Sequence, residues 1–94
     1  MRLRWTAAAQ ADLEAIIDYF LAENPTIAGD IVERIDQAVR PLVDHPGIGR
    51  PGRVTGSREL VVSGLPYILP YQVSPDTIII LRVLHSAQRW PTKF

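Results

Sequence analysis

The apolar positions in the first half of the chain recur with two different periods, which predict one strand followed by two helices. Apolar residues alternate with arginines across residues 1–5, the pattern of a strand with one buried face. Thr6 can cap a helix that ends near Asn24, with an apolar face of Leu13, Ile16, Ile17, Phe20 and Leu21. Asn24 and Pro25 begin a second helix, with an apolar stripe of Ile27, Ile31, Ile35, Ala38, Val39 and Leu42. Because almost no linker separates them, we expect the helices to form an antiparallel hairpin.

The second half of the chain predicts a loop and three sequential strands. Residues 45–53 are dense in glycine and proline and are compatible only with a loop or turns. Strand-forming residues then fill positions 59–62, 67–73 and 77–84, with turn-forming residues between them. The last run is apolar at nearly every position, which predicts a central strand covered on both faces, whereas Pro70 disfavours a central place for the strand before it. The order is β-α-α-β-β-β, an α+β fold in which a helical hairpin packs on a small, mainly antiparallel sheet.

Length and composition restrict the kind of protein that this chain can form. The 94 residues, 47% of them hydrophobic, suffice for a single domain over residues 1–94 that is marginally stable alone and gains from a bound partner. The chain has no cysteine, which excludes a disulfide framework and a sulfur-based zinc site. The start lacks the apolar run of a signal peptide, and no stretch approaches the length of a membrane span. We therefore expect a cytoplasmic protein that does not associate with membranes.

The formal net charge of zero conceals a strong asymmetry between the two halves of the chain. Residues 1–46 contain four arginines and eight carboxylates, whereas residues 47–94 contain six cations and two carboxylates. Such a separation is typical of two faces with different partners, one of which is anionic, although ordinary solvated charge would look similar.

Most sequence signatures of enzymes are absent from the chain. It contains no HExxH or GxSxG motif and no acidic metal cluster. The glycines at 47, 49 and 52 lack the preceding strand and the following helix of a phosphate-binding loop. The acids of the predicted helices lie opposite the apolar stripes, where solvated charge is expected.

Arginines supply two groups of candidate binding residues. Arg50, Arg53 and Arg58 form a basic rim before the second strand, which either holds phosphates or carboxylates bidentately or is simply solvated. Arg82 is a lone charge inside an apolar strand, where it is unfavourable unless it is functional or paired with an acid. Of these two alternatives we favour a functional role.

The segment after the last strand supplies the third group. Residues 84–91 combine His85, Arg89 and Trp90, residue types that binding surfaces use. A histidine at a strand end and a tryptophan that plugs a core are the ordinary alternatives.

Four segments are specific in combination, although each alone would be weak. They are residues 3–13 (LRWTAAAQADL), 45–52 (HPGIGRPG), 58–60 (REL) and 80–85 (ILRVLH). Together with the order of the elements, they resemble the ParE/RelE superfamily of toxins from type II toxin–antitoxin systems, more closely its ParE branch. The resemblance extends across almost the whole chain.

The resemblance implies a toxin that is neutralised by a co-expressed, ParD-like antitoxin, whose C-terminal segment wraps the helical hairpin and the sheet. Members of the superfamily divide into two functional classes. RelE-like members cleave mRNA on the ribosome, and ParE-like members are associated with inhibition of DNA gyrase and do not cleave RNA.

The chain departs from the catalytic sets of the RNA-cleaving class. Those members use several lysines and arginines with a tyrosine, or a glutamate with a histidine and a tyrosine. Here the only lysine is Lys93, no tyrosine follows Tyr71, and no acid lies between Asp44 and Glu59. The positions that match in part are Arg58, Arg82 and His85. They supply a phosphate clamp without a complete acid–base set, which favours gyrase inhibition.

Three hypotheses follow from the sequence. The first is a growth-arresting toxin that binds DNA gyrase, needs no cofactor or metal and has an antitoxin as obligate partner. The second is a metal-independent ribonuclease acting on ribosome-bound mRNA, with Arg58 and Arg82 holding the phosphate and His85 as proton donor. The third is an inactive interaction module. Under the first, the hairpin covers one face of the sheet while the apolar strand 78–84 needs cover on both, so we expect an unfilled groove in the free protein that an antitoxin segment occupies. We also expect a target-binding anchor at Arg89 and Trp90.

Overall fold

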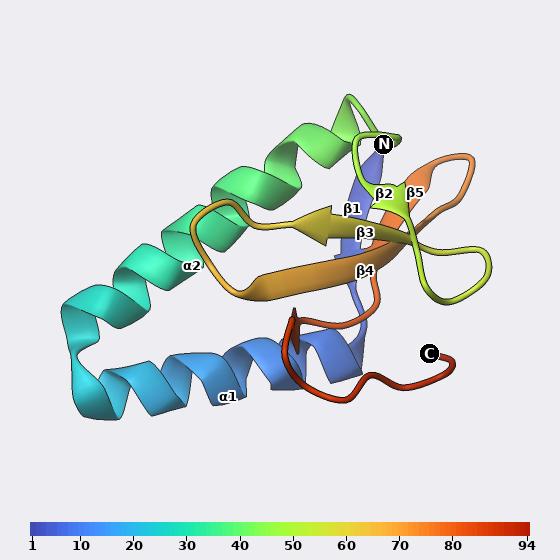
Figure 1. Ribbon diagram of the computed structural model, residues 1–94. Coiled ribbons are helices and arrows are strands. Elements are labelled where there is room, and N and C mark those ends of the chain that lie inside the picture. Colours follow the sequence, from blue (N-terminus) through green and yellow to red (C-terminus); the bar gives the residue numbers. More distant parts are fainter.

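The computed structural model describes residues 1–94 and places two helices against one sheet (Figure 1). The elements are β1 (Arg2–Trp5), α1 (Ala7–Glu23), α2 (Pro25–Val39), a 3-10 helix η1 (Arg40–Val43), β2 (Arg50–Pro51), β3 (Arg58–Val61), β4 (Tyr67–Val73), β5 (Thr77–Ile80) and β6 (Leu84–His85). This order confirms the predicted α+β class and the arrangement of strand, helices and strands. It adds two short strands, β2 and β6, which the sequence pattern did not indicate.

Each of the two α-helices begins directly after the residue that the sequence predicts as its cap. The Thr6 hydroxyl oxygen accepts a hydrogen bond from the Ala9 amide at 3.0 Å, and the Asn24 side-chain oxygen accepts one from the Thr26 amide at 3.0 Å. Asn24 also ends α1, so a single residue separates the helices. In Figure 1 they diverge from this turn like the arms of a V, and both border the sheet. No helix is long and apolar enough to cross a lipid bilayer.

The sheet has the strand order β1-β5-β4-β3-β2, with β6 paired to β4 beyond the end of β5. β1 runs parallel to β5, and every other pairing is antiparallel. The sheet is therefore mainly antiparallel, as predicted. The single parallel pair joins the first strand of the chain to the strand at Thr77–Ile80.

Pro70 lies in the central strand of the sheet, so the prediction that it keeps β4 out of the centre is wrong. The Pro70 carbonyl accepts a hydrogen bond from the Leu81 amide at 2.8 Å. In an antiparallel strand the nitrogen and the carbonyl of one residue face the same neighbour. The proline nitrogen therefore faces residues 81–83, which belong to no strand, so no ladder hydrogen bond is lost there.

Two further boundaries differ from the prediction. The run 77–84 is not one strand, because β5 ends at Ile80 and the chain pairs with β4 again only at Leu84. Within the predicted loop 45–53, Arg50 and Pro51 form β2 against β3. Both differences arise from pairing with distant residues, which local pattern does not encode.

The two helices cover the sheet unequally. α2 buries Ala28, Ile31, Ile35 and Val39, whereas α1 buries only Ala9 completely. The other apolar residues of α1 that reach the core, Leu13, Ile16 and Phe20, are only partly buried. Leu21, expected on the buried face, is 48% exposed, and Ile27 at the start of α2 is 43% exposed. The hairpin therefore leaves apolar surface uncovered, mainly along α1.

Candidate functional site

The loop before β3 is fixed by two buried or half-buried side chains. The Tyr71 hydroxyl is fully buried, donates to the Pro46 carbonyl at 2.7 Å and accepts from the Gly49 amide at 2.9 Å. The Arg58 guanidinium donates to the carbonyls of Gly49 at 2.6 Å and Gly47 at 3.0 Å. Arg58 therefore holds the backbone of this loop. Its guanidinium is less available to a ligand than the sequence suggested.

Close approach explains why residue 49 is glycine. A Cβ atom at this position would lie 2.5 Å from the Tyr71 hydroxyl and 2.8 Å from the Glu59 carbonyl oxygen. Both distances are shorter than side-chain carbon atoms tolerate, so the loop can pack against β3 and β4 only without a side chain here.

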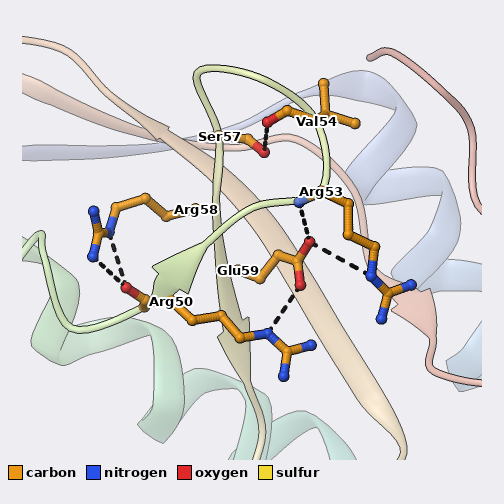
Figure 2. Close-up of polar contacts among 7 residues, drawn as sticks. Arg50, Arg53, Val54, Ser57, Arg58 and Glu59 are labelled. Carbon is orange, nitrogen blue, oxygen red and sulfur yellow. Dashed lines mark hydrogen bonds and ion pairs between the residues drawn. The ribbon is translucent and has the colours of Figure 1, made fainter.

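A buried carboxylate organises the rest of the basic rim (Figure 2). The Glu59 side chain is 2% exposed, accepts a hydrogen bond from Arg50 Nε at 3.0 Å and another from the Arg53 amide at 2.7 Å. The Arg53 Nε lies 3.9 Å from the same carboxylate. Because a buried carboxylate needs such partners, Glu59 fixes both arginines while about half of each side chain stays exposed. Sequence reasoning named the arginines and missed the acid that positions them.

The C-terminal segment lies against this rim. The Arg53 guanidinium carbon is 3.8 Å from the centroid of the Trp90 ring, a cation–π contact. The Trp90 indole N–H donates to the His85 carbonyl at 3.3 Å. Trp90 is therefore half-buried and bound to the fold, not free as expected for a terminal anchor, whereas Arg89 is exposed.

Arg82 forms an ion pair, the second of the two alternatives that the sequence allowed. Its Nε and Nη2 donate to the Asp12 carboxylate at 2.7 and 3.0 Å, and the Val83 amide donates to the same carboxylate at 3.0 Å. The hydrogen bond from Arg82 to Asp12 raises the pKa of Arg82 above its ordinary value, with burial opposing the rise. Asp12 had been grouped with the solvated acids of the helices. In the structure it joins α1 to the segment between β5 and β6.

His85 lies at the mouth of a cleft beside α1. The cleft has a volume of about 300 Å³, and its lining includes Asp12, Ile16, Tyr67, Val83 and His85. The His85 ring meets Tyr67 edge to face, and its Nδ1 accepts from the Ala87 amide at 3.0 Å. Burial, and secondarily the nearby Tyr19, raise the pKa of the Tyr67 hydroxyl.

The strand register separates Arg58 from His85, two of the three residues that would form a ribonuclease site. Arg58 lies opposite Tyr71, and His85 lies opposite Tyr67, on either side of β4. Four residues of strand correspond to about 13 Å at ~3.3 Å per residue. The Arg58 guanidinium is further held at the Tyr71 end by the loop carbonyls. No group of three or more histidine and acidic side chains in the chain could hold a metal ion.

The fold is a helical hairpin on a mixed sheet, and the second half of the chain carries a basic rim. These are the features of the class of small toxin domains that the sequence segments resemble. Comparison with family models places the chain in this class: residues 3–90 match the model of the ParE toxin of the type II toxin–antitoxin system parDE. The chain therefore belongs to the ParE toxin family.

Individual relatives agree with this assignment. The chain is 44% identical over 90 residues to toxin Y4kP of Sinorhizobium fredii, covering 96% of this chain and 93% of that protein. It is 38% identical over 84 residues to toxin RelE2 of Caulobacter vibrioides, covering 89% and 93%. Among solved structures, a chain of the chromosomal ParDE system from P. aeruginosa superposes with a TM-score of 0.81 at 39% identity, covering 90% of this chain and 95% of that one.

Proposed function

We propose that this toxin acts by binding and not by cleaving RNA, that its target is DNA gyrase, and that a ParD-like antitoxin neutralises it. The observation that supports this most strongly is the separation of Arg58 from His85 along β4. A general acid must lie within about 3 Å of the group it protonates, or one water molecule away. A phosphate held by Arg58 would leave His85 out of reach.

The ion pair between Arg82 and Asp12 supports the same proposal. Both of its bonded nitrogens face Asp12, which also accepts the Val83 amide. Transfer of Arg82 to a phosphate would strip the half-buried Asp12 carboxylate of its cation. A phosphate clamp built on Arg82 therefore costs an existing ion pair before it gains a new one.

The test is induction of the free chain in a sensitive host with two readouts taken together. Gyrase inhibition predicts DNA-damage signalling in the host and gyrase cleavage complexes on supercoiled plasmid in vitro. RNA cleavage predicts codon-associated cuts when the 5′ ends of transcripts are mapped. Cuts without cleavage complexes would replace our proposal with the ribonuclease, and normal growth with neither readout would leave an inactive interaction module.

Two variants sharpen this test. His85→Asn keeps an acceptor near the Nδ1 position that the Ala87 amide uses, yet removes the titratable ring. We expect it to stay toxic, whereas a ribonuclease would lose a proton-transfer group that contributes about 10²–10⁴-fold. Truncation after Gln88 removes Arg89 and Trp90, and we expect it to abolish toxicity while antitoxin binding persists. A truncated chain that remains fully toxic would contradict a target-binding role for Arg89 and Trp90.

We propose that the antitoxin binds along α1. The cleft beside Tyr67 and His85 is open there, and Tyr19 and Leu21 on the same helix are 63% and 48% exposed. An amphipathic antitoxin segment would cover this apolar surface. Saturating antitoxin should raise the free energy of unfolding by roughly 4 kcal/mol at a thousandfold excess over its dissociation constant. An unchanged melting temperature under these conditions would refute antitoxin binding to the folded chain.

A further inference from the structure

Two pairs of arginines point to the sheet face that lies away from the helices, called here the far face. Leu60 belongs to the core under the helices, so its strand neighbour Glu59, and Arg50 opposite it, point the other way. Leu3 and Trp5 pack against the same core, so the residues that alternate with them also point away. The far face is defined by Arg2, Arg4, Arg50 and Arg53.

The pair at the β2 edge is pre-organised. Arg50 Nε donates to Glu59, and Arg53 Nε lies 3.9 Å from the same carboxylate, which leaves the terminal nitrogens of each guanidinium free of protein acceptors. Trp90 stacks on Arg53 and further limits its motion. An arginine whose orientation is fixed before binding loses less side-chain entropy when it meets an anion.

The pair at the opposite edge has no acidic partner. Arg2 and Arg4 are exposed on β1 and take part in none of the ion pairs of the chain. Four strand spacings separate β1 from β2 in the sheet, about 19 Å at ~4.8 Å per spacing. A single phosphate cannot bridge two cationic clusters at that separation, whereas an extended anionic polymer can.

Most of the acids of the chain lie on the helices and not among these arginines. The helices carry seven carboxylates, Asp12, Glu14, Asp18, Glu23, Asp30, Glu33 and Asp36. On the far face, by contrast, Glu59 is buried between its arginines. The chain as a whole is neutral, so a polyanion has no general attraction to it and would be drawn to a surface where arginines gather.

We propose that the far face binds the sugar–phosphate backbone of double-stranded DNA, with Arg2 and Arg4 on one stretch of backbone and Arg50 and Arg53 on another. Arginine forks suit phosphate oxygens, and such contacts position a protein without reading sequence. The choice of duplex DNA over RNA rests on the proposed action on gyrase. The toxin would then contact the DNA that gyrase holds, while its antitoxin-binding helices face outward.

The experiment measures fluorescence anisotropy of a labelled 20-bp duplex titrated with the full-length free toxin, without gyrase, at several NaCl concentrations. Four phosphate contacts predict a slope of log K against log[NaCl] of about −4. Arg2→Ala/Arg4→Ala, which breaks no ion pair, should reduce the slope by about 2 and weaken binding about tenfold. Arg34→Ala/Arg40→Ala removes the same charge from the helix layer and should leave both values unchanged.

A second pair of substitutions tests the β2 edge without leaving the buried Glu59 carboxylate unpaired. Arg50→Lys/Arg53→Lys preserves the charges that face the buried carboxylate but removes the planar forks. We expect the salt slope to stay near that of the unaltered chain while affinity falls, because a lysine ammonium binds phosphate as a point charge. Equal affinity would contradict bidentate contacts between these two arginines and the phosphates.

The proposal is overturned if no saturable duplex binding occurs in 25 mM NaCl, if the helix-layer control weakens binding as much as Arg2→Ala/Arg4→Ala, or if single-stranded RNA binds at least tenfold more tightly than the duplex. Gyrase cleavage assays separate this inference from the proposed function. Duplex binding without cleavage complexes would support the far face and refute gyrase as the target. Undiminished gyrase poisoning by a variant that no longer binds DNA would support the target and refute the far face.

Discussion

Removal of the Tyr71 hydroxyl tests how much the loop before β3 depends on one buried group. In Tyr71→Phe the ring still fills the core, but the Gly49 amide loses its acceptor and the Pro46 carbonyl loses its donor. Because the hydroxyl is fully buried, water cannot replace it without a cavity. A buried polar group left without a partner costs about 1–3 kcal/mol. We expect a loss of about 2 kcal/mol in the free energy of unfolding.

Urea denaturation of the free chain, followed by circular dichroism, measures this loss directly. A loss of 2 kcal/mol corresponds to a fall of roughly 10 °C in the melting temperature of a domain of this size. Tyr19→Phe is the matched control, since Tyr19 is 63% exposed and its hydroxyl has no hydrogen-bond partner within the chain. A loss below about 0.5 kcal/mol for Tyr71→Phe, or equal losses for both variants, would refute the structural role of this hydroxyl.

Two further predictions concern the cleft beside α1. Asp12→Asn should reduce stability by about 1–3 kcal/mol in urea denaturation, because it replaces an acceptor of three hydrogen bonds by an amide that faces Arg82 with a donor. Asp36→Asn, in the exposed ion pair with Arg40, should change the free energy of unfolding little. Equal losses for the two variants would contradict the inference that the Asp12 pair stabilises the fold more than the exposed pair. The pKa of Tyr67 is raised above 10.0 in the folded state. The neutral hydroxyl therefore contributes to the free energy of unfolding below that pH, and this contribution is lost as the pH rises through the raised pKa. Unfolding between about pH 9 and pH 11.5 should therefore show a smaller fall in stability for Tyr67→Phe than for the unaltered chain, and parallel curves would be inconsistent with this shift.

The sequence predicted the helices well because their signals are local. Thr6 and Asn24 cap the turns that follow them, and both side-chain bonds span three residues or fewer. The strands were harder, because pairing partners decide their ends. Residues 81–83 leave the ladder opposite Pro70, and nothing in the apolar run 77–84 marks that break.

For the candidate site too, residue types could be read from the sequence, whereas contacts between residues far apart in the chain could not. Arg82 was recognisable as an anomaly, but its partner Asp12 lies 70 positions earlier on a helix whose acids otherwise look ordinary. Glu59 was noted only as the residue that ends a stretch without acids. That isolation was the available signal, since one carboxylate among Arg50, Arg53 and Arg58 in the sequence is the natural centre of an ion-pair cluster.

The parallel pairing of β1 with β5 determines when the protein can fold during its synthesis. Strand β1 is among the first segments made, yet Leu3 pairs with Ile78, and Thr6 donates to the Leu81 carbonyl 75 positions away. At ~5–20 residues per second, the first strand waits about 4–15 s for its partner. The amino-terminal helices meanwhile lack the sheet that covers them, and such non-local closure is intrinsically slow. A chain that ends before residue 77 therefore lacks the partner of its first strand and is an unfinished domain.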